Sequence, residues 1–203
     1  MPPEPPPPVP TLPVHDHLLP YAGRLEPRDP ARIDLVVIHC TELPDLATAR
    51  EYGERIVHPA SGTGNSGHFY IDRDGSVHRY VPLDRVAHHV RDWNARSLGI
   101  ELVNTGRYPD WWDSRRQEMN EPYPAAQTGA LVGLLARLAR ECPGLRWITG
   151  HEDLDTGLVD ATDAPGASVR RKRDPGPMFP WDEVLARIPL RRLAPGPGAP
   201  RPL

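Results

Sequence analysis

Two histidines in this 203-residue chain each end an apolar stretch at the point where the sequence turns polar. His39 closes "IDLVVIH" and His151 closes "LRWITGH". In an open α/β sheet, ligands gather at the ends of strands, so the two imidazoles can meet if their strands are neighbours. Either histidine alone is more often a hydrogen-bonded structural residue. Two ligands, moreover, do not hold a catalytic zinc ion.

A third candidate ligand lies in "RRKRDPGPMFPW", where Asp174 precedes a Pro-Gly-Pro that fixes the backbone and can aim the carboxylate. Two histidines and one carboxylate, with a fourth position left open, are an established catalytic zinc arrangement. Lys172 stands two residues earlier and could reach the same cavity. The spacing alone slightly favours the alternative of a basic solvated loop, because Arg170, Arg171 and Arg173 surround this lysine.

Other chemical motifs fit the chain less well. The sequence contains no H-E-x-x-H, no P-C-x-x-C, no G-x-S-x-G, no Walker loop and no G-x-G-x-x-G. The two cysteines, Cys40 and Cys142, form no C-x-x-C pair, so neither a thiolate zinc site nor a redox motif is expected. Cys40 is expected on the core side of its strand, and a disulfide between the two has no positive support.

The elements that would position these residues read as mixed α/β. We predict strands at 33–39, 97–104 and 145–151, a hairpin over 67–81 that turns at Asp74-Gly75, and helices at 45–57, 124–141 and 181–188. The helix at 124–141 is the clearest, because four leucines between 131 and 138 keep the i, i+3, i+4, i+7 spacing. Together these elements predict a single α/β domain with a central mixed β-sheet flanked by helices and a cleft at the strand ends.

The composition sets the limits of that domain and of its partners. Much of the 27-proline count lies at the two ends, so we expect a proline-rich arm over 1–30, a folded domain over 31–190 and a Pro/Gly-rich tail over 191–203. Net charge is −3, which argues against nucleic-acid binding through a global positive field. We expect no membrane span and, because the N-terminus lacks the features of a secretory signal, a cytoplasmic protein.

Five blocks of sequence carry a resemblance to a known family. They are "VVIHCTE", "SGHFYIDRDGSVHRYV", "VAHHVRDWNARSLGIELVN", "WITGHEDL" and "KRDPGP". In this order they resemble the type-2 N-acetylmuramoyl-L-alanine amidases, a zinc family with bacterial anhydromuropeptide and phage members that is similar to the peptidoglycan recognition proteins. The resemblance covers roughly residues 31–190 and implies one Zn²⁺ held by His39, His151 and Asp174.

The resemblance also implies roles for residues around the metal. Glu101 in "LGIE" would be the general base, and Lys172 would stabilise the oxyanion of the tetrahedral intermediate. His89, Trp93 and Asn94 would bind substrate. From the residues alone, Glu101 lies on the face of its strand opposite to its apolar neighbours, which fits a cleft or plain solvent equally. Trp93 is as readily a core residue as a groove-lining one.

The implied reaction is zinc-dependent hydrolysis of the amide between the lactyl group of N-acetylmuramic acid and L-alanine, in peptidoglycan or in anhydromuropeptide fragments. Two alternatives remain: a non-catalytic peptidoglycan-binding module, and a secreted or effector-type lytic amidase. We expect a monomer. The segment 152–171 is longer than is usual for the family, so it is expected to act as a lid or to alter substrate choice. It also contains two rival carboxylates, Asp160 and Asp163.

Overall fold

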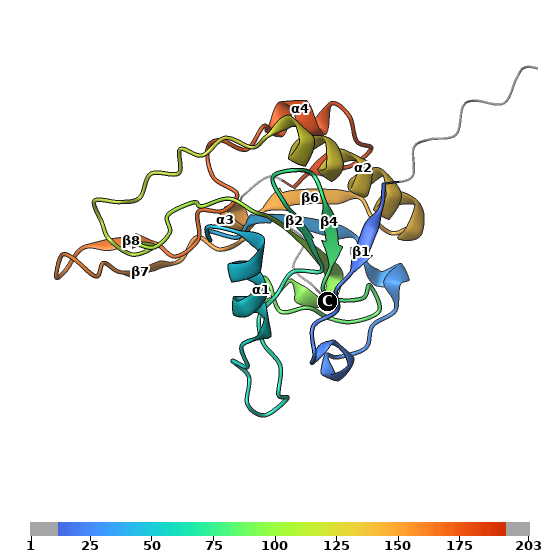
Figure 1. The fold of residues 1–203 in the computed structure, drawn as a ribbon, viewed down its shortest axis with the longest axis horizontal. Coiled ribbons are helices and arrows are strands. Elements are labelled where there is room, and N and C mark those ends of the chain that lie inside the picture. Colours follow the sequence, from blue (N-terminus) through green and yellow to red (C-terminus); the bar gives the residue numbers. More distant parts are fainter. Residues whose placement is uncertain (1–11, 194–203) are drawn as a thin grey trace, which may run out of the picture.

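Seven strands form a mixed sheet in the order β1-β4-β3-β5-β2-β6-β9, within residues 12–193, the part of the chain that the computed structural model describes. These strands are Val14–Asp16 (β1), Leu35–Cys40 (β2), Phe69–Ile71 (β3), Val77–Arg79 (β4), Ser97–Leu102 (β5), Trp147–Gly150 (β6) and Arg191–Arg192 (β9). Every neighbouring pair is parallel except β3 and β4. Two further strands, Leu158–Asp160 (β7) and Ser168–Arg170 (β8), form a separate antiparallel ribbon that projects to one side (Figure 1).

Strand β2 lies between two parallel neighbours, and all six of its residues are buried. A continuous apolar run is what a strand covered on both faces requires. On one side, His39 is paired in register with Glu101 of β5; on the other, Ile38 is paired with Gly150 of β6. His151 follows Gly150 directly, so the carboxyl ends of β2 and β6 bring the two predicted histidines to the same edge of the sheet.

Helices cover both faces of the sheet. The α-helices are Leu46–Glu54 (α1), Ala125–Glu141 (α2), His151–Leu154 (α3) and Trp181–Leu185 (α4), and three 3₁₀ turns span Ala22–Arg24, Pro30–Arg32 and Asn94–Arg96. Helices α2 and α4 lie on one side of the sheet and α1 on the other (Figure 1). None of the helices within residues 12–193 is long and apolar enough to cross a bilayer.

The helices begin and pack as the sequence predicts. Four leucines of α2 are fully buried in the main core cluster, namely Leu131, Leu134, Leu135 and Leu138. Helix α1 begins after Asp45, whose side chain accepts a hydrogen bond from the backbone N–H of Thr48 at 2.7 Å. The predicted hairpin is present as β3 and β4, and its turn places Gly75 at φ 88, a left-handed conformation that favours glycine. Helix α4 is shorter than predicted and ends at Leu185.

The folded domain extends beyond the boundaries expected at residues 31 and 190. Strand β1 pairs with β4, and Leu19 and Tyr21 are buried, with the Tyr21 hydroxyl donating to the carbonyl of Gly53 at 2.6 Å. At the other end, β9 adds to the sheet and Leu193 is buried. The sequence did not predict β1, because a run of three residues between prolines is too short to show a strand periodicity. Residues 1–11 and 194–203 of the predicted arm and tail lie outside the described residues.

The two cysteines are both free and buried, so they do not form a disulfide. Cys40 lies on the buried strand β2, and Cys142 packs at the end of α2 in the main core. Both cysteines are small buried side chains of the interior and are not a disulfide pair.

Candidate active site

Three side chains that could hold a metal ion meet at the carboxyl edge of the sheet. His39 is the next-to-last residue of β2, His151 begins α3, and Asp174 lies on the segment that follows β8. Asp174 Oδ2 is 2.9 Å from His39 Nδ1 and 3.1 Å from His151 Nδ1. The three donor atoms all lie within 4.8 Å of one another, and all three residues are buried.

The charges of this cluster suit a metal ligand set. Burial, followed by the neighbouring His151, lowers the pKa of His39 to about 4, so its imidazole is neutral at pH 7. Burial alone would raise the pKa of Asp174, but His151, His39 and Lys172 together hold it well below its usual value. The second oxygen of this carboxylate, Oδ1, is buried with no hydrogen-bond partner within residues 12–193. The neutral imidazole of His39 and an ionised carboxylate with a spare oxygen are donors that suit a divalent cation.

Glu101 stands beside this cluster without joining it. Its Oε1 lies 3.9 Å from His39 Nδ1, and its side chain is 14% exposed. Burial, followed by the charge of Asp174, raises the pKa of Glu101 well above its usual value. The approach depends on Gly67, because a Cβ there would lie 2.8 Å from Glu101 Cγ. A carboxyl group with a raised pKa beside a metal ligand set is placed to accept and release a proton.

His89 contacts the cluster from the opposite side. Its Nδ1 lies 3.0 Å from His39 Nε2, and its Nε2 lies 3.2 Å from the hydroxyl of Ser97. The ring fits against Gly99, where a Cβ would come within 2.6 Å of His89 Cγ. Asn94 holds this segment, since its side-chain oxygen accepts a hydrogen bond from the backbone N–H of His89 at 3.0 Å. His89 and Asn94, two of the three residues predicted to bind substrate, line the cleft, and both also fix the local structure.

Trp93 differs from the expectation of a groove-lining residue. It is half-buried against Leu35, Val37 and Leu193, and the guanidinium of Arg96 lies over its ring at 5.5 Å. It is not among the described residues that line the cleft. Trp93 is therefore a packed residue, which is the alternative that the sequence left equally open.

A cleft of about 980 Å³ opens in front of the cluster. Lys172 lines it, as do the aromatic side chains of Tyr52, Trp111 and Trp112. Trp112 is 47% exposed, so an indole face is available to a ligand. The sequence did not indicate these aromatic residues. Tyr52 lies on α1 and the two tryptophans in an irregular segment, and only the fold brings them together at the rim of the cleft.

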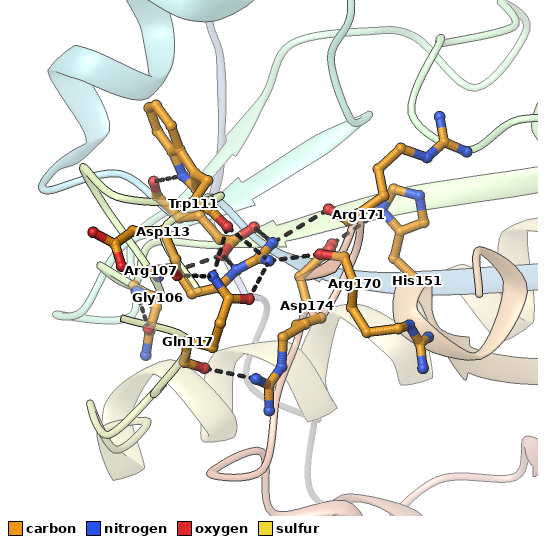
Figure 2. A network of polar contacts seen from close by, with 12 residues as sticks. Gly106, Arg107, Trp111, Asp113, Gln117, His151, Arg170, Arg171 and Asp174 are labelled. Carbon is orange, nitrogen blue, oxygen red and sulfur yellow. Dashed lines mark hydrogen bonds and ion pairs between the residues drawn. The ribbon is translucent and has the colours of Figure 1, made fainter. Parts of the chain in front are cut away.

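A buried arginine, Arg107, forms hydrogen bonds to several segments around the cleft. Arg107 forms a bidentate pair with Glu42, at 2.6 Å from Nε to Oε1 and 2.8 Å from Nη2 to Oε2. The same guanidinium donates to the carbonyl of Arg170 at 2.9 Å and to Gln117 Oε1 at 3.1 Å, as Figure 2 shows. Glu42 is thus fully engaged and is not free to act as a base. The sequence did not indicate Arg107, because its partners Glu42 and Arg170 lie more than sixty positions away.

The segment 152–171 contains the β7–β8 ribbon, and neither of its two rival carboxylates belongs to the cluster. Asp163 accepts hydrogen bonds from the backbone N–H of Ser114 at 2.6 Å and from the Ser114 hydroxyl at 2.9 Å. Asp160 is exposed on β7. The backbone N–H of Thr162 donates to the carbonyl of Trp112 at 2.8 Å, which attaches the ribbon to the aromatic rim. Of the three carboxylates, Asp174 is the one that meets the two histidines.

Comparison with known proteins agrees with this arrangement. Residues 29–177 match the N-acetylmuramoyl-L-alanine amidase family profile. Over 124 residues the chain is 34% identical to 1,6-anhydro-N-acetylmuramyl-L-alanine amidase AmpD of Escherichia coli K12, which covers 57% of this chain and 54% of that protein. The chain therefore spans about half the length of the curated relatives that it matches.

Two solved structures share the fold. The N-acetylmuramoyl-L-alanine amidase LysC from Clostridium intestinale superposes with a TM-score of 0.61 at 22% identity, covering 88% of this chain and 99% of that one. The amidase AmiD from E. coli, solved with the substrate anhydro-N-acetylmuramic acid-L-Ala-D-γ-Glu-L-Lys, gives a TM-score of 0.57 at 23% identity, covering 77% and 57%. The family profile matches the five central strands of the sheet and all three clustered side chains, which places this chain in the N-acetylmuramoyl-L-alanine amidase family.

Proposed function

We propose that this chain is a zinc-dependent hydrolase that cleaves the amide between the lactyl group of N-acetylmuramic acid and L-alanine in peptidoglycan fragments. The observation that carries the proposal is the buried cluster of His39, His151 and Asp174, with Glu101 beside it at the floor of a cleft. The three side chains would hold the zinc ion. Bound there, zinc would lower the pKa of a coordinated water and polarise the scissile carbonyl.

The chain's own residues would supply the proton transfers. In the proposed reaction, Glu101 accepts a proton from the attacking water and passes it to the nitrogen of the leaving L-alanine, which would otherwise depart as a poor leaving group. Its raised pKa makes the carboxylate a stronger base than an ordinary glutamate, so it accepts the proton of the water more readily and can then donate it to the leaving nitrogen. His89, 3.0 Å from His39, keeps that ring in its orientation toward the cluster.

Lys172 would stabilise the negative charge that develops on the carbonyl oxygen. It lines the cleft and lies two residues before Asp174, so the same segment delivers a ligand and a cation. Removing such a donor from an enzyme typically costs about 10²–10³ in rate. All of these groups come from one chain, so a monomer would hold a complete site.

Soluble anhydromuropeptides are the substrates that we favour over the intact polymer. The curated relatives are named for a 1,6-anhydro-N-acetylmuramyl substrate, and AmiD was solved with such a molecule bound. The cleft of about 980 Å³ has the size of a site for one such fragment. A cytoplasmic location stays a prediction.

Digestion of the two substrates side by side tests the proposal. The purified protein should release a peptide with a free L-alanine amine from 1,6-anhydro-N-acetylmuramyl tripeptide, detected by mass spectrometry, and release less from intact sacculi. A chelator should abolish the release and added Zn²⁺ should restore it. Uncleaved muropeptide that nevertheless binds the zinc-loaded protein would instead support a non-catalytic peptidoglycan-binding module.

A further inference from the structure

Three imidazoles gather at the outer edge of the sheet, apart from the residues that line the cleft. His15 lies on β1, His17 follows β1 directly, and His78 lies on β4. The ring centroids of His17 and His78 are 5.1 Å apart, those of His15 and His78 are 5.4 Å apart, and those of His15 and His17 are 6.3 Å apart. The proposed amidase reaction uses none of these rings.

Strand geometry explains why the three rings share one face. His15 and His17 are two residues apart, so they point to the same side of an extended chain. The parallel register sets His15 directly opposite His78, which places the third ring on that side as well. Asp16 is directed elsewhere and pairs with Arg79 at 2.7 Å. The His-x-His arrangement and its cross-strand partner therefore follow from the pairing of β1 with β4.

The spacing of one pair of ring nitrogens matches metal coordination. His17 Nδ1 and His78 Nδ1 are 3.1 Å apart. Two nitrogens that each lie about 2.0–2.1 Å from a tetrahedral zinc ion are roughly 3.3 Å from one another. His15 is exposed at the sheet edge, so a rotation of its side chain can bring in a third nitrogen.

We propose that His15, His17 and His78 form a second metal site, separate from the cleft, for an imidazole-preferring divalent ion such as Zn²⁺, Ni²⁺ or Cu²⁺. Imidazole donors without a carboxylate favour these ions over Mg²⁺ or Ca²⁺. β4 is the only sheet neighbour of β1 within residues 12–193. An ion held by the three rings would therefore cross-link the N-terminal edge strand to the rest of the sheet.

Zinc stoichiometry of the full chain tests the site. The protein is dialysed to equilibrium against Zn²⁺, and bound metal is counted by elemental analysis. The wild type is expected to carry one zinc ion more than His78→Ala or His17→Ala. Asp16→Asn, on the same strand with its side chain on the opposite face, is the matched control and should carry as much zinc as the wild type. Because the result is a difference between variants, it holds whether or not the cleft also binds zinc.

Copper provides a second readout that a general change in surface charge would not produce. Cu²⁺ added to the zinc-loaded protein should show nitrogen hyperfine splitting from more than one imidazole in its electron paramagnetic resonance spectrum, and His78→Ala should reduce that splitting. Equal zinc counts in the wild type, His17→Ala and His78→Ala would overturn the proposal and leave a simple hydrogen bond between two rings. Loss of the additional zinc from Asp16→Asn as complete as from His78→Ala would overturn it as well.

Discussion

Two buried carboxylates of one site, Glu101 and Asp174, have pKa values displaced in opposite directions. Burial and the charge of Asp174 raise the pKa of Glu101, whereas His151, His39 and Lys172 outweigh burial and lower the pKa of Asp174. Two titratable groups whose pKa values are displaced in opposite directions typically have different roles in an active site. The ionised Asp174 suits a ligand, and the group that protonates more readily suits a base.

Replacing Glu101 by glutamine should separate catalysis from binding. The variant keeps the shape of the side chain and removes the proton acceptor, so turnover should fall by about 10²–10⁴. Zinc content and muropeptide affinity should stay close to those of the wild type. Glu51→Gln, the same change at an exposed position of α1, is the control and should keep full activity. Wild-type turnover in Glu101→Gln would mean that the base is elsewhere.

Replacing Asp174 tests which carboxylate binds the metal. Asp174→Asn should lose most of the bound zinc, measured by elemental analysis, because the anionic oxygen between the two histidines is removed. Asp163→Asn should keep its zinc, since Asp163 is engaged with Ser114. The reverse pattern would move the third ligand into the segment 152–171.

At the scale of elements, the cleft depends on three segments that one guanidinium holds together. Arg107 belongs to the segment after β5, Glu42 follows β2, and Arg170 ends β8. The Arg107 side chain is 1% exposed, so its charge is compensated by Glu42, by Gln117 and by the surrounding carbonyls rather than by water. Lys172 and Asp174 continue from the same anchored strand, and their positions therefore depend on the Arg107 pair.

Arg107→Met should destabilise the fold strongly. Removing one partner of a buried ion pair leaves the other uncompensated and typically costs about 3–5 kcal/mol. Urea unfolding followed by circular dichroism measures the loss. Arg115→Met, at a side chain that is 78% exposed, should change stability little. The double variant Glu42→Leu/Arg107→Met should be more stable than Arg107→Met alone, because no buried charge is left unpaired; equal losses in both variants would contradict this account.

Shortening the β7–β8 ribbon at its tip should alter substrate range rather than metal binding. Replacing residues 161–167 by a two-residue turn removes the contacts of Thr162 and Asp163 with the loop that carries Trp112. The aromatic rim would then be held less firmly, so KM for muropeptides should rise more than kcat falls. Zinc content, measured on the same samples, should not change. A loss of zinc would show that the ribbon supports the ligands themselves.

At the scale of the whole molecule, local patterns predicted the sheet centre and both helical layers but missed the elements that need distant partners. His39 and His151 were predictable because each ends an apolar run, a signal contained in neighbouring residues. Arg107 was not, since a charged residue in an irregular segment reveals nothing about a partner 65 positions away. Strand β1 was not predicted, because it has only three residues. Whether Trp93 packs in the core or lines the cleft was not predictable, because no local pattern shows which side it faces.

The same reasoning predicts that a fragment cut at the boundaries expected from composition will not fold stably. A fragment of residues 31–190 lacks β1, β9 and the buried side chains of Leu19, Tyr21 and Leu25. Each large apolar side chain typically contributes about 1.5–3 kcal/mol when buried, against a total stability of roughly 5–15 kcal/mol for a domain. A fragment of residues 12–193 is the control and should show a cooperative thermal transition by calorimetry. A transition of equal midpoint in both fragments would contradict the assignment.

The three side chains that would hold zinc are drawn from far apart in the chain, with 135 positions between His39 and Asp174. An unfolded chain rarely brings such distant groups together, since closing a long loop has an entropic cost. Zinc would then bind the native state almost exclusively, and the free-energy difference would appear as resistance to heat and to proteases. Supply of the metal would thus set the lifetime of this protein in a cell as well as its turnover. Zinc starvation would reduce its abundance, because the zinc-free protein would be less resistant to proteases.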